Sequence, residues 1–329
     1  MALLEVQDIV VDFSTRAGMA RVLDHVSLKV EAGQTLGIVG ESGCGKSMTA
    51  LSIIGLVPNP PGEVTSGSIT LDGEELLNAD EARIRKIRGK DISMIFQEPM
   101  TSLNPVFTVG EQIAESLRLH EDGTAAEAWA KTIEMIRSVG IPEPEIRAKN
   151  YPHQLSGGMR QRIMIAMALA CGPRLLIADE PTTALDVTVQ AQIFDLLTDL
   201  QQGNNTAIIL ITHDMGVISQ MSDHVAVMYA GRIIETGTTK EILSSPQHPY
   251  TKGLIACVPH LEENPSDERQ PLMEIPGVVP LLTNLGKGCA FAPRCPQRMP
   301  KCDEAKPSMV DCSSSHQAAC LAISNGATA

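Results

Sequence analysis

Long apolar runs are scarce in this chain of 329 residues. The longest candidates, 163–170 and 207–211, fall well short of the ~20 apolar residues that a helix needs to cross a bilayer. The sequence therefore predicts no membrane span. The first residues lack a basic segment and include Glu5 and Asp8, so we expect no secretory signal and a cytoplasmic protein.

Basic residues are also under-represented. The chain has 26 Lys and Arg against 39 Asp and Glu, which gives a net charge of −13. This balance argues against a nucleic-acid partner, because such binding rests mainly on Lys and Arg that neutralise phosphates. With 43% hydrophobic and 20% charged residues, the composition is that of a folded protein, and the length predicts about two domains.

The hydrophobic pattern alternates strands with helices. Residues 1–39 are predicted to form three strands, and 46–56 has helical spacing. The apolar segments 175–179 and 206–212 are typical of parallel strands buried on both faces, so we expect an α/β sheet. Further predictions are a strand and turn in 66–76, a strand ending at Gln97, helices at 108–119, 125–139 and 189–201, and a hairpin at 224–237.

A glycine-rich loop lies between the strand that ends near residue 39 and the helix that begins at Lys46. Residues 40–47, GESGCGKS, fit the pattern G-x-x-x-x-G-K-[ST], whose backbone N–H groups cradle phosphates. Lys46 is expected to contact the β- and γ-phosphates, and the Ser47 hydroxyl to hold Mg²⁺. The alternative is a chance glycine-rich turn.

Two acids end a predicted buried strand, at the sheet edge where α/β proteins bind ligands. We predict that Asp179 helps to hold Mg²⁺ and that Glu180 acts as the general base. The alternative is a pair of acids that cap the next helix.

A second candidate phosphate site precedes a long apolar helix. Residues 155–161, LSGGMRQ, place Ser156 and two glycines at that helix N-terminus. One nucleotide does not need two such sites in one subunit, so the simplest hypothesis is that each site serves the nucleotide of a facing subunit. Alone, this pattern is equally compatible with an ordinary helix cap.

Together these motifs resemble those of the ATP-binding cassette (ABC) ATPases. In family order they are Walker A at 40–47, the Q-loop at Gln97, the signature at 155–161, Walker B at 175–179 with Glu180, the D-loop at 184–186 and the switch His213. The resemblance covers about residues 1–240. It implies an α/β P-loop NTPase with a RecA-like core, an antiparallel β subdomain and a helical signature subdomain at about 99–162.

The resemblance also implies a head-to-tail dimer that encloses two ATP molecules. ATP would be bound in cis by Gly40, Glu41, Ser42, Gly43, Cys44, Gly45, Lys46, Ser47 and Met48, and in trans by Leu155, Ser156, Gly157, Gly158, Met159 and Asp186. Mg²⁺ would be held by Ser47, Gln97 and Asp179, and catalysis would use Glu180, His213 and Gln97.

Adenine in this family stacks on an aromatic residue upstream of Walker A. Aromatic residues make up only 3% of the chain, and Phe13 is the only one before Phe96. Phe13 is therefore the candidate, although its position also suits a buried strand residue.

Five of the eight cysteines lie between residues 289 and 320. In a reducing compartment this density favours a metal site over disulfides. The spacing of Cys289, Cys295, Cys302 and Cys320 lacks the C-x₂-C pairs typical of structural zinc and does not identify the metal. Proline also becomes denser past residue 237, so we place a boundary at 238, between domains 1–238 and 239–329.

Residues 239–329 resemble the C-terminal extension of the oligopeptide and dipeptide importer ATPases. The resemblance rests on HPYT at 248–251, IPGVVP at 275–280 and the cysteines. Some of these proteins carry a [4Fe-4S] cluster on four such cysteines, which would make Cys289, Cys295, Cys302 and Cys320 its ligands. Zinc and unmetallated thiols remain alternatives.

The resemblance implies an ATPase subunit of an importer for peptides or a related solute, peripheral at the cytoplasmic face of the bacterial inner membrane. Its partners would be a second ATPase subunit, the same or a related one, two membrane permease subunits and, indirectly, an extracytoplasmic solute-binding protein. Alternatives are a nucleic-acid-handling ABC ATPase and a non-transport regulatory module. The stretch between Lys46 and Ser156 is too short for the long coiled coil that nucleic-acid-handling relatives insert.

Overall fold

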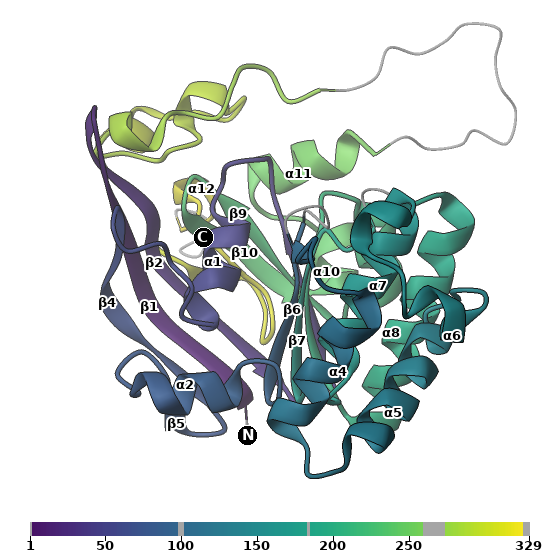
Figure 1. Ribbon diagram of the computed structural model, residues 1–329. Coiled ribbons are helices and arrows are strands. Elements are labelled where there is room, and N and C mark those ends of the chain that lie inside the picture. Colours follow the sequence, from purple (N-terminus) through teal and green to yellow (C-terminus); the bar gives the residue numbers. More distant parts are fainter. Residues whose placement is uncertain (1, 98–101, 183–184, 259–273, 325–329) are drawn as a thin grey trace, which may run out of the picture.

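The computed structural model describes residues 2–97, 102–182, 185–258 and 274–324. Within them the strands form one four-stranded and one eight-stranded sheet. Figure 1 shows the antiparallel strands on one side, the helices α4 to α8 on the other and the parallel strands between them. The predicted α/β architecture is confirmed.

The larger sheet has the order β11-β12-β10-β9-β3-β8-β7-β6, and the parallel strands β3, β8, β7 and β6 form one side of it. Every residue of the four strands β3, β8, β7 and β6 is buried. Their bounds are β3 (Thr35–Val39), β6 (Ile92–Ile95), β7 (Leu175–Asp179) and β8 (Ala207–Ile211). One face packs on the group of helices that includes α7 and α8, and the other packs on the antiparallel sheet and α1, which explains why these segments are apolar without alternation.

The antiparallel sheet has the order β2-β1-β4-β5. It consists of β1 (Ala2–Thr15), β2 (Gly18–Glu31), β4 (Gly62–Leu71) and β5 (Glu74–Glu75). The predicted turn at Asp72 and Gly73 is confirmed, with φ of 51° and 80°, as a tight hairpin requires. Strand β4 begins four residues before the predicted start at Ser66, because it pairs with β1 as far as Phe13 opposite Gly62.

The helices fall into two groups. Helices α4 (Val109–His120), α5 (Ala125–Ser138), α6 (Pro144–Arg147) and α7 (Gly157–Leu169) form the predicted helical insertion. The apolar faces of α4, α5 and α7 share one core with α8 (Val187–Asn204). The remaining helices are α1 (Lys46–Ile53), α2 (Glu81–Ile87), α9 (Met215–Met221), α10 (Thr239–Ser244), α11 (Pro249–Ala256) and α12 (Leu321–Ser324). No helix in the described ranges is long and apolar enough to cross a membrane.

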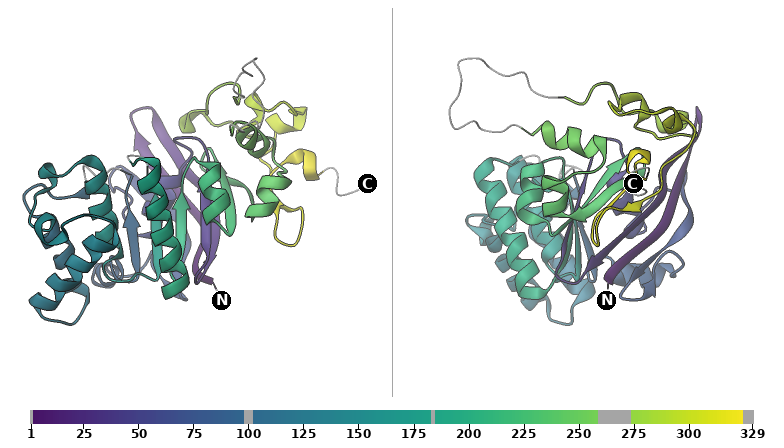
Figure 2. Two further views of the ribbon diagram at one scale, coloured as in Figure 1. Left: turned by 90° about the vertical axis from the view of Figure 1, so that its right-hand side faces the viewer. Right: turned by 180° about the vertical axis from the view of Figure 1, so that it is seen from behind.

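Residues beyond the expected boundary at 238 pack onto the same sheet. Strand β10 (Arg232–Thr238) pairs with β9 (His224–Tyr229) on one side and with β12 (Gln317–Ala318) on the other, and β11 (Val310–Asp311) follows β12. Between them, the 3-10 turns η2 (Leu282–Asn284), η3 (Ala292–Arg294) and η4 (Pro300–Asp303) lie at one end of the sheet (Figure 2). The described residues 239–258 and 274–324, called the extension below, thus pack against the same sheet as the rest of the chain.

A buried carboxylate anchors the extension to β10. Glu235 is fully buried and accepts hydrogen bonds from the backbone N–H groups of Gln247 and His248, at 2.6 and 2.9 Å. Nε2 of His316 lies 2.7 Å from the same carboxylate. Nearby, the hydroxyl of Ser313 and then the Thr238 cap lower the pKa of Glu241 to about 2, so this side chain stays ionised and holds the same strand end.

We expect His316→Phe to lower the free energy of unfolding by about 2 kcal/mol, because a hydrogen bond to a buried carboxylate would be lost. Urea denaturation followed by circular dichroism would measure this. Gln317→Ala, which removes an exposed side chain from the adjacent position, serves as the control and should change stability little. An equal loss in both variants would contradict the role of the Glu235 contact.

Candidate functional site

The loop 40–47 joins β3 to α1 and lies against the end of β9. A Cβ atom at Gly40 would lie 2.2 Å from the carbonyl oxygen of Met228, so no larger residue fits there. Gly45 caps α1 with φ of 109°, a left-handed conformation that favours glycine. The loop therefore adopts a tight turn that directs the N-terminus of α1 toward the cavity described below.

Lys46 is buried at the start of α1, with 7% of its surface exposed. Its ammonium donates hydrogen bonds to the carbonyl oxygens of Gly40, at 2.6 Å, and Glu41, at 3.1 Å. Carbonyl groups compensate the charge only partly, so the ammonium is available to an anion that approaches the loop.

Asp179 lies beside Ser47 at the carboxyl end of β7. Burial raises the pKa of Asp179, while a hydrogen bond with Ser47 and the charge of Lys46 oppose this rise. A buried carboxylate next to a hydroxyl is a donor set of the kind that Mg²⁺ prefers in phosphate-binding loops. These two residues therefore fit the predicted metal position.

Glu180 is held between two side chains from different loops. Nε2 of Gln97 donates to one carboxylate oxygen at 3.0 Å, and Nδ1 of His213 lies 3.2 Å from the other. The backbone of Glu180 has φ of 47°, which is uncommon for a residue other than glycine. The structure therefore brings the three residues predicted to be catalytic into direct contact.

A cavity of about 280 Å³ lies between the phosphate loop and these side chains. Its volume is near the lower end of the range for small-molecule sites. It is lined by Val22, Ser42, Gly43, Gly45, Lys46, Ser47, Met48, Gln97 and Glu180. The phosphate loop, Gln97 and Glu180 thus converge on one cavity beside the N-terminus of α1.

Other residues predicted to bind ATP in cis lie next to this lining. Gly40 and Glu41 line a neighbouring cavity of about 390 Å³ that also includes His213. Cys44 is fully buried beneath the loop. Phe13 lies on β1, where its ring covers the backbone of Gly62, and Val22 of β2 lines the 280 Å³ cavity instead.

The signature residues lie on the helical side of the molecule. Ser156 caps α7 by accepting a hydrogen bond from the N–H of Met159, and Ser156 and Gly157 are exposed. Leu155 is buried beneath them, and Gly158 is half-buried against Leu185. Among the described residues, the lining of the 280 Å³ cavity includes none of the positions 155–159.

The D-loop is described from Leu185 onward, and Ala184 lies outside the described residues. Asp186 is exposed and caps α8, since its carboxylate accepts the N–H of Val189 at 3.0 Å.

The four predicted cysteine ligands line one small cavity in the extension. Cys289, Cys295, Cys302 and Cys320 surround it together with His248 and Phe291, and its volume is about 20 Å³. Burial raises the pKa values of the Cys289 and Cys295 thiols. Within the part of the chain that the structure describes, no group of three or more His, Cys, Asp or Glu side chains has the arrangement of a metal site.

A contact between the extension and the phosphate loop was not predicted from the sequence. Arg294 of η3 makes a two-pronged ion pair with Glu41, with N–O distances of 2.6 and 2.9 Å. The hydroxyl of Tyr250 accepts the backbone N–H of Glu41 at 2.8 Å. No periodicity or motif relates residues so far apart, although both Tyr250 and Arg294 lie within or beside segments that the family resemblance rests on.

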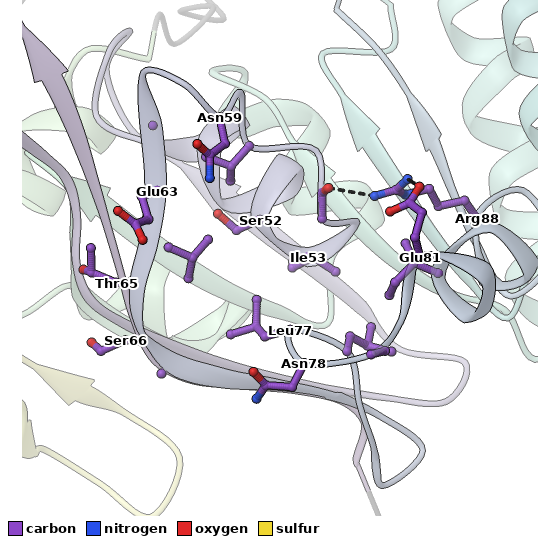
Figure 3. Close-up of a pocket in the computed structure, with 18 residues that line it drawn as sticks. Ser52, Ile53, Asn59, Glu63, Thr65, Ser66, Leu77, Asn78, Glu81 and Arg88 are labelled. Carbon is purple, nitrogen blue, oxygen red and sulfur yellow. Dashed lines mark hydrogen bonds and ion pairs between the residues drawn. The ribbon is translucent and has the colours of Figure 1, made fainter.

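A larger cavity, of about 560 Å³, lies at the opposite end of α1 (Figure 3). Ser52 and Ile53 of α1, Glu63 of β4 and Glu81 of α2 contribute to its lining. Arg88 closes one side by donating to the carbonyl oxygens at positions 54 and 55. Its described lining includes no residue of the phosphate loop, so it is separate from the candidate site.

Two family descriptions match the chain. "ABC transporter" matches residues 23–183, and "Oligopeptide/dipeptide transporter, C-terminal region" matches residues 234–302. Among curated relatives, the dipeptide transport ATP-binding protein DppD of Bacillus subtilis is 50% identical over 96% of this chain and 93% of its own length. The oligopeptide transport ATP-binding protein OppD of Escherichia coli is 51% identical over 93% of this chain and 89% of its own length.

Solved structures show the same fold. The ATP-binding cassette MJ0796, a dimer in a post-hydrolysis state bound to ADP and Pi, matches with a TM-score of 0.66 and 26% identity over 72% of this chain and 98% of its own. CbiO1 of Clostridium perfringens, part of the ABC transporter complex CbiONQ, matches with a TM-score of 0.61 and 26% identity over 74% of this chain and 91% of its own.

Lys46→Ala should raise the dissociation constant for ATP by about tenfold or more, because a hydrogen bond to a charged group contributes about 1.5–3 kcal/mol. Isothermal titration calorimetry with the full chain would measure this. Lys29→Ala is the matched control, since Lys29 is an exposed lysine that pairs with Glu5 on the antiparallel sheet. Unchanged ATP affinity in Lys46→Ala would contradict a phosphate-binding role.

Proposed function

Because the chain belongs to the ABC transporter ATPases, in the branch of the oligopeptide and dipeptide importers, we propose that it hydrolyses ATP to drive the import of peptides or a related small solute. The observation that carries this proposal is the convergence of the phosphate loop, Gln97 and Glu180 on one cavity. Nearly full-length similarity to peptide transport ATPases supports the solute class.

For hydrolysis, Glu180 is the general base that accepts a proton from the attacking water. Its contacts with Gln97 and His213 support this role, because they orient the carboxylate from two sides. His213 and Gln97 would in addition contact the γ-phosphate and the metal. Mg²⁺, held by Ser47, Asp179 and Gln97, would neutralise the charge on the transferred phosphoryl group.

ATP is bound in cis by residues 40–48, with adenine stacked on Phe13. The adenine assignment rests on the scarcity of aromatic residues before Walker A. Because Val22 lines the 280 Å³ cavity, the effect of substituting Val22 should be compared with that of substituting Phe13.

The active form is a head-to-tail dimer, either of two identical chains or with a related subunit. Leu155, Ser156, Gly157, Gly158, Met159 and Asp186 would complete the nucleotide site of the facing subunit. Two observations support this arrangement: the exposed N-terminus of α7 does not contribute to the cavity of its own chain, as far as the structure describes it, and the similar cassette MJ0796 is dimeric. An exposed helix N-terminus is suited to binding the phosphates of a second chain's nucleotide.

Closure of this dimer would move two permease subunits in the membrane, which receive solute from an extracytoplasmic binding protein. The subunit would thus act at the cytoplasmic face of the bacterial inner membrane. A nucleic-acid partner is disfavoured by the net charge of −13.

We further propose that Cys289, Cys295, Cys302 and Cys320 hold a [4Fe-4S] cluster, with zinc as the alternative. The support is that all four thiols line one cavity, and thiolates are the usual cluster ligands. At about 20 Å³ the cavity has room for about one water, so the side chains would have to separate to accept a cluster.

Glu180→Gln should slow ATP hydrolysis by about 10² to 10⁴, the usual contribution of a general base, and should leave ATP binding intact. Phosphate release by the assembled transporter and ATP titration of the same preparation would measure the two properties separately. Turnover near the wild-type rate would contradict the assignment of Glu180.

Anaerobically purified full-length protein should contain iron and acid-labile sulfide in equal amounts. Cys295→Ser should lose both, because it removes one ligand, whereas Cys312→Ser, at an exposed thiol outside the cavity, should retain them. Stoichiometric zinc without iron would contradict the cluster and favour the alternative.

A further inference from the structure

We propose that Arg294 of the extension is a positioning residue for ATP binding, which acts by holding Glu41 of the phosphate loop. This inference rests on the nucleotide site proposed above and adds a residue from a different part of the chain. Arg294 itself lines neither the 280 Å³ cavity nor, among the described residues, the cavity beside it. Its effect on ATP would therefore be transmitted through Glu41.

The contact between Arg294 and Glu41 is close and directional. Both terminal nitrogens of the guanidinium bind the carboxylate, at 2.6 and 2.9 Å. Only 4% of the Arg294 side chain and 30% of the Glu41 side chain are exposed. A bidentate pair that is shielded from water is stronger and more restrictive in geometry than an exposed ion pair.

The extension fixes the guanidinium independently of Glu41. Nε of Arg294 donates to the carbonyl oxygen of Pro276 at 2.9 Å, and Nη2 donates to that of Ile275 at 3.1 Å. The guanidinium carbon also lies 5.9 Å from the ring centres of Tyr229 and Phe291. Arg294 is therefore held in place before the loop binds to it, and little side-chain entropy is lost in the contact.

The backbone of Glu41 is bound by the same part of the chain. The hydroxyl of the fully buried Tyr250 accepts the N–H of Glu41 at 2.8 Å. The carbonyl oxygen of Glu41 in turn accepts a hydrogen bond from Lys46. The extension thus binds Glu41, which is one of the two residues whose carbonyl oxygens accept hydrogen bonds from the ammonium of Lys46.

The charge of Glu41 links its contact with Arg294 to ATP binding. Without Arg294, the carboxylate of Glu41 would remain unneutralised next to a loop that must receive a polyanion, and like charges at such short range oppose binding. The loop would also lose the contact that fixes its second residue. Loss of Arg294 should therefore weaken ATP binding, and removal of the Glu41 charge should restore much of it.

The test is a double-mutant cycle on ATP affinity with full-length protein, measured by calorimetry. Arg294→Met keeps the long side chain in place and should raise the dissociation constant about tenfold, within the range for directly contacting residues. Adding Glu41→Gln should recover most of this loss. A general structural defect would not be rescued, so additive effects of the two substitutions would overturn the proposal.

Two further variants keep the test decisive. Arg298→Met removes an exposed ion pair with Asp303 in the same extension and should leave ATP affinity unchanged. If Arg294→Met does not fold, Arg294→Lys takes its place: it keeps a cation at this position but cannot form the two-pronged pair with Glu41, so it should weaken ATP binding, and wild-type affinity would overturn the proposal.

Lys46→Ala separates this inference from the site on which it rests. If wild-type protein binds ATP and Lys46→Ala does not, the nucleotide site is correct, and an unaffected Arg294→Met variant refutes only the role of Arg294. If Lys46→Ala binds ATP as well as wild type does, the nucleotide site itself is wrong, and the role of Arg294 is overturned with it.

Discussion

The close approach of the phosphate loop to strand β9 is the constraint on which the site depends. A side chain at Gly40 would collide with the carbonyl oxygen of Met228, and one at Gly45 would lie 2.9 Å from side-chain carbons of Leu23 and Met228. The turn of the β9–β10 hairpin adds a hydrogen bond from the N–H of Gly231 to the carbonyl of Cys44. The loop is therefore packed between the antiparallel sheet and the larger sheet, and these contacts set the direction of α1 and the position of Lys46.

Sheet order then brings the remaining groups to the loop. Strands β3, β8, β7 and β6 are neighbours, and they run parallel, so their carboxyl ends lie along one edge. The phosphate loop, His213, the Asp179–Glu180 pair and Gln97 each follow one of these strands. Segments separated by more than a hundred residues thus meet within hydrogen-bond distance, and the buried strands provide a rigid support for them.

The sequence was sufficient where a pattern is local. Buried strands are apolar without interruption, and the hairpin turns at Asp72–Gly73 and Ala230–Gly231 need residues that tolerate positive φ. Helices α2 and α9 were missed because each spans only seven residues, too few for a clear period. The contact of Arg294 with Glu41 was missed because a single pair 253 residues apart leaves no periodic signal. The sequence was enough to name the four cysteines, but the distances between their thiols depend on tertiary packing and could not be predicted.

Glu41 and Arg294 of the extension compensate each other's charge, and each would be unfavourable without the other. An acidic residue in a loop that receives phosphate is a cost unless a cation compensates it, and here that cation is Arg294 of the extension. Conversely, a guanidinium with 4% exposure would be a buried unpaired charge without Glu41. Glu235 on β10 gives a second such case, since its buried carboxylate is bound only by residues beyond 238 among those described. The extension is therefore bound both to β10, through Glu235, and to the phosphate loop, through Glu41, and these two contacts fix its position relative to the loop.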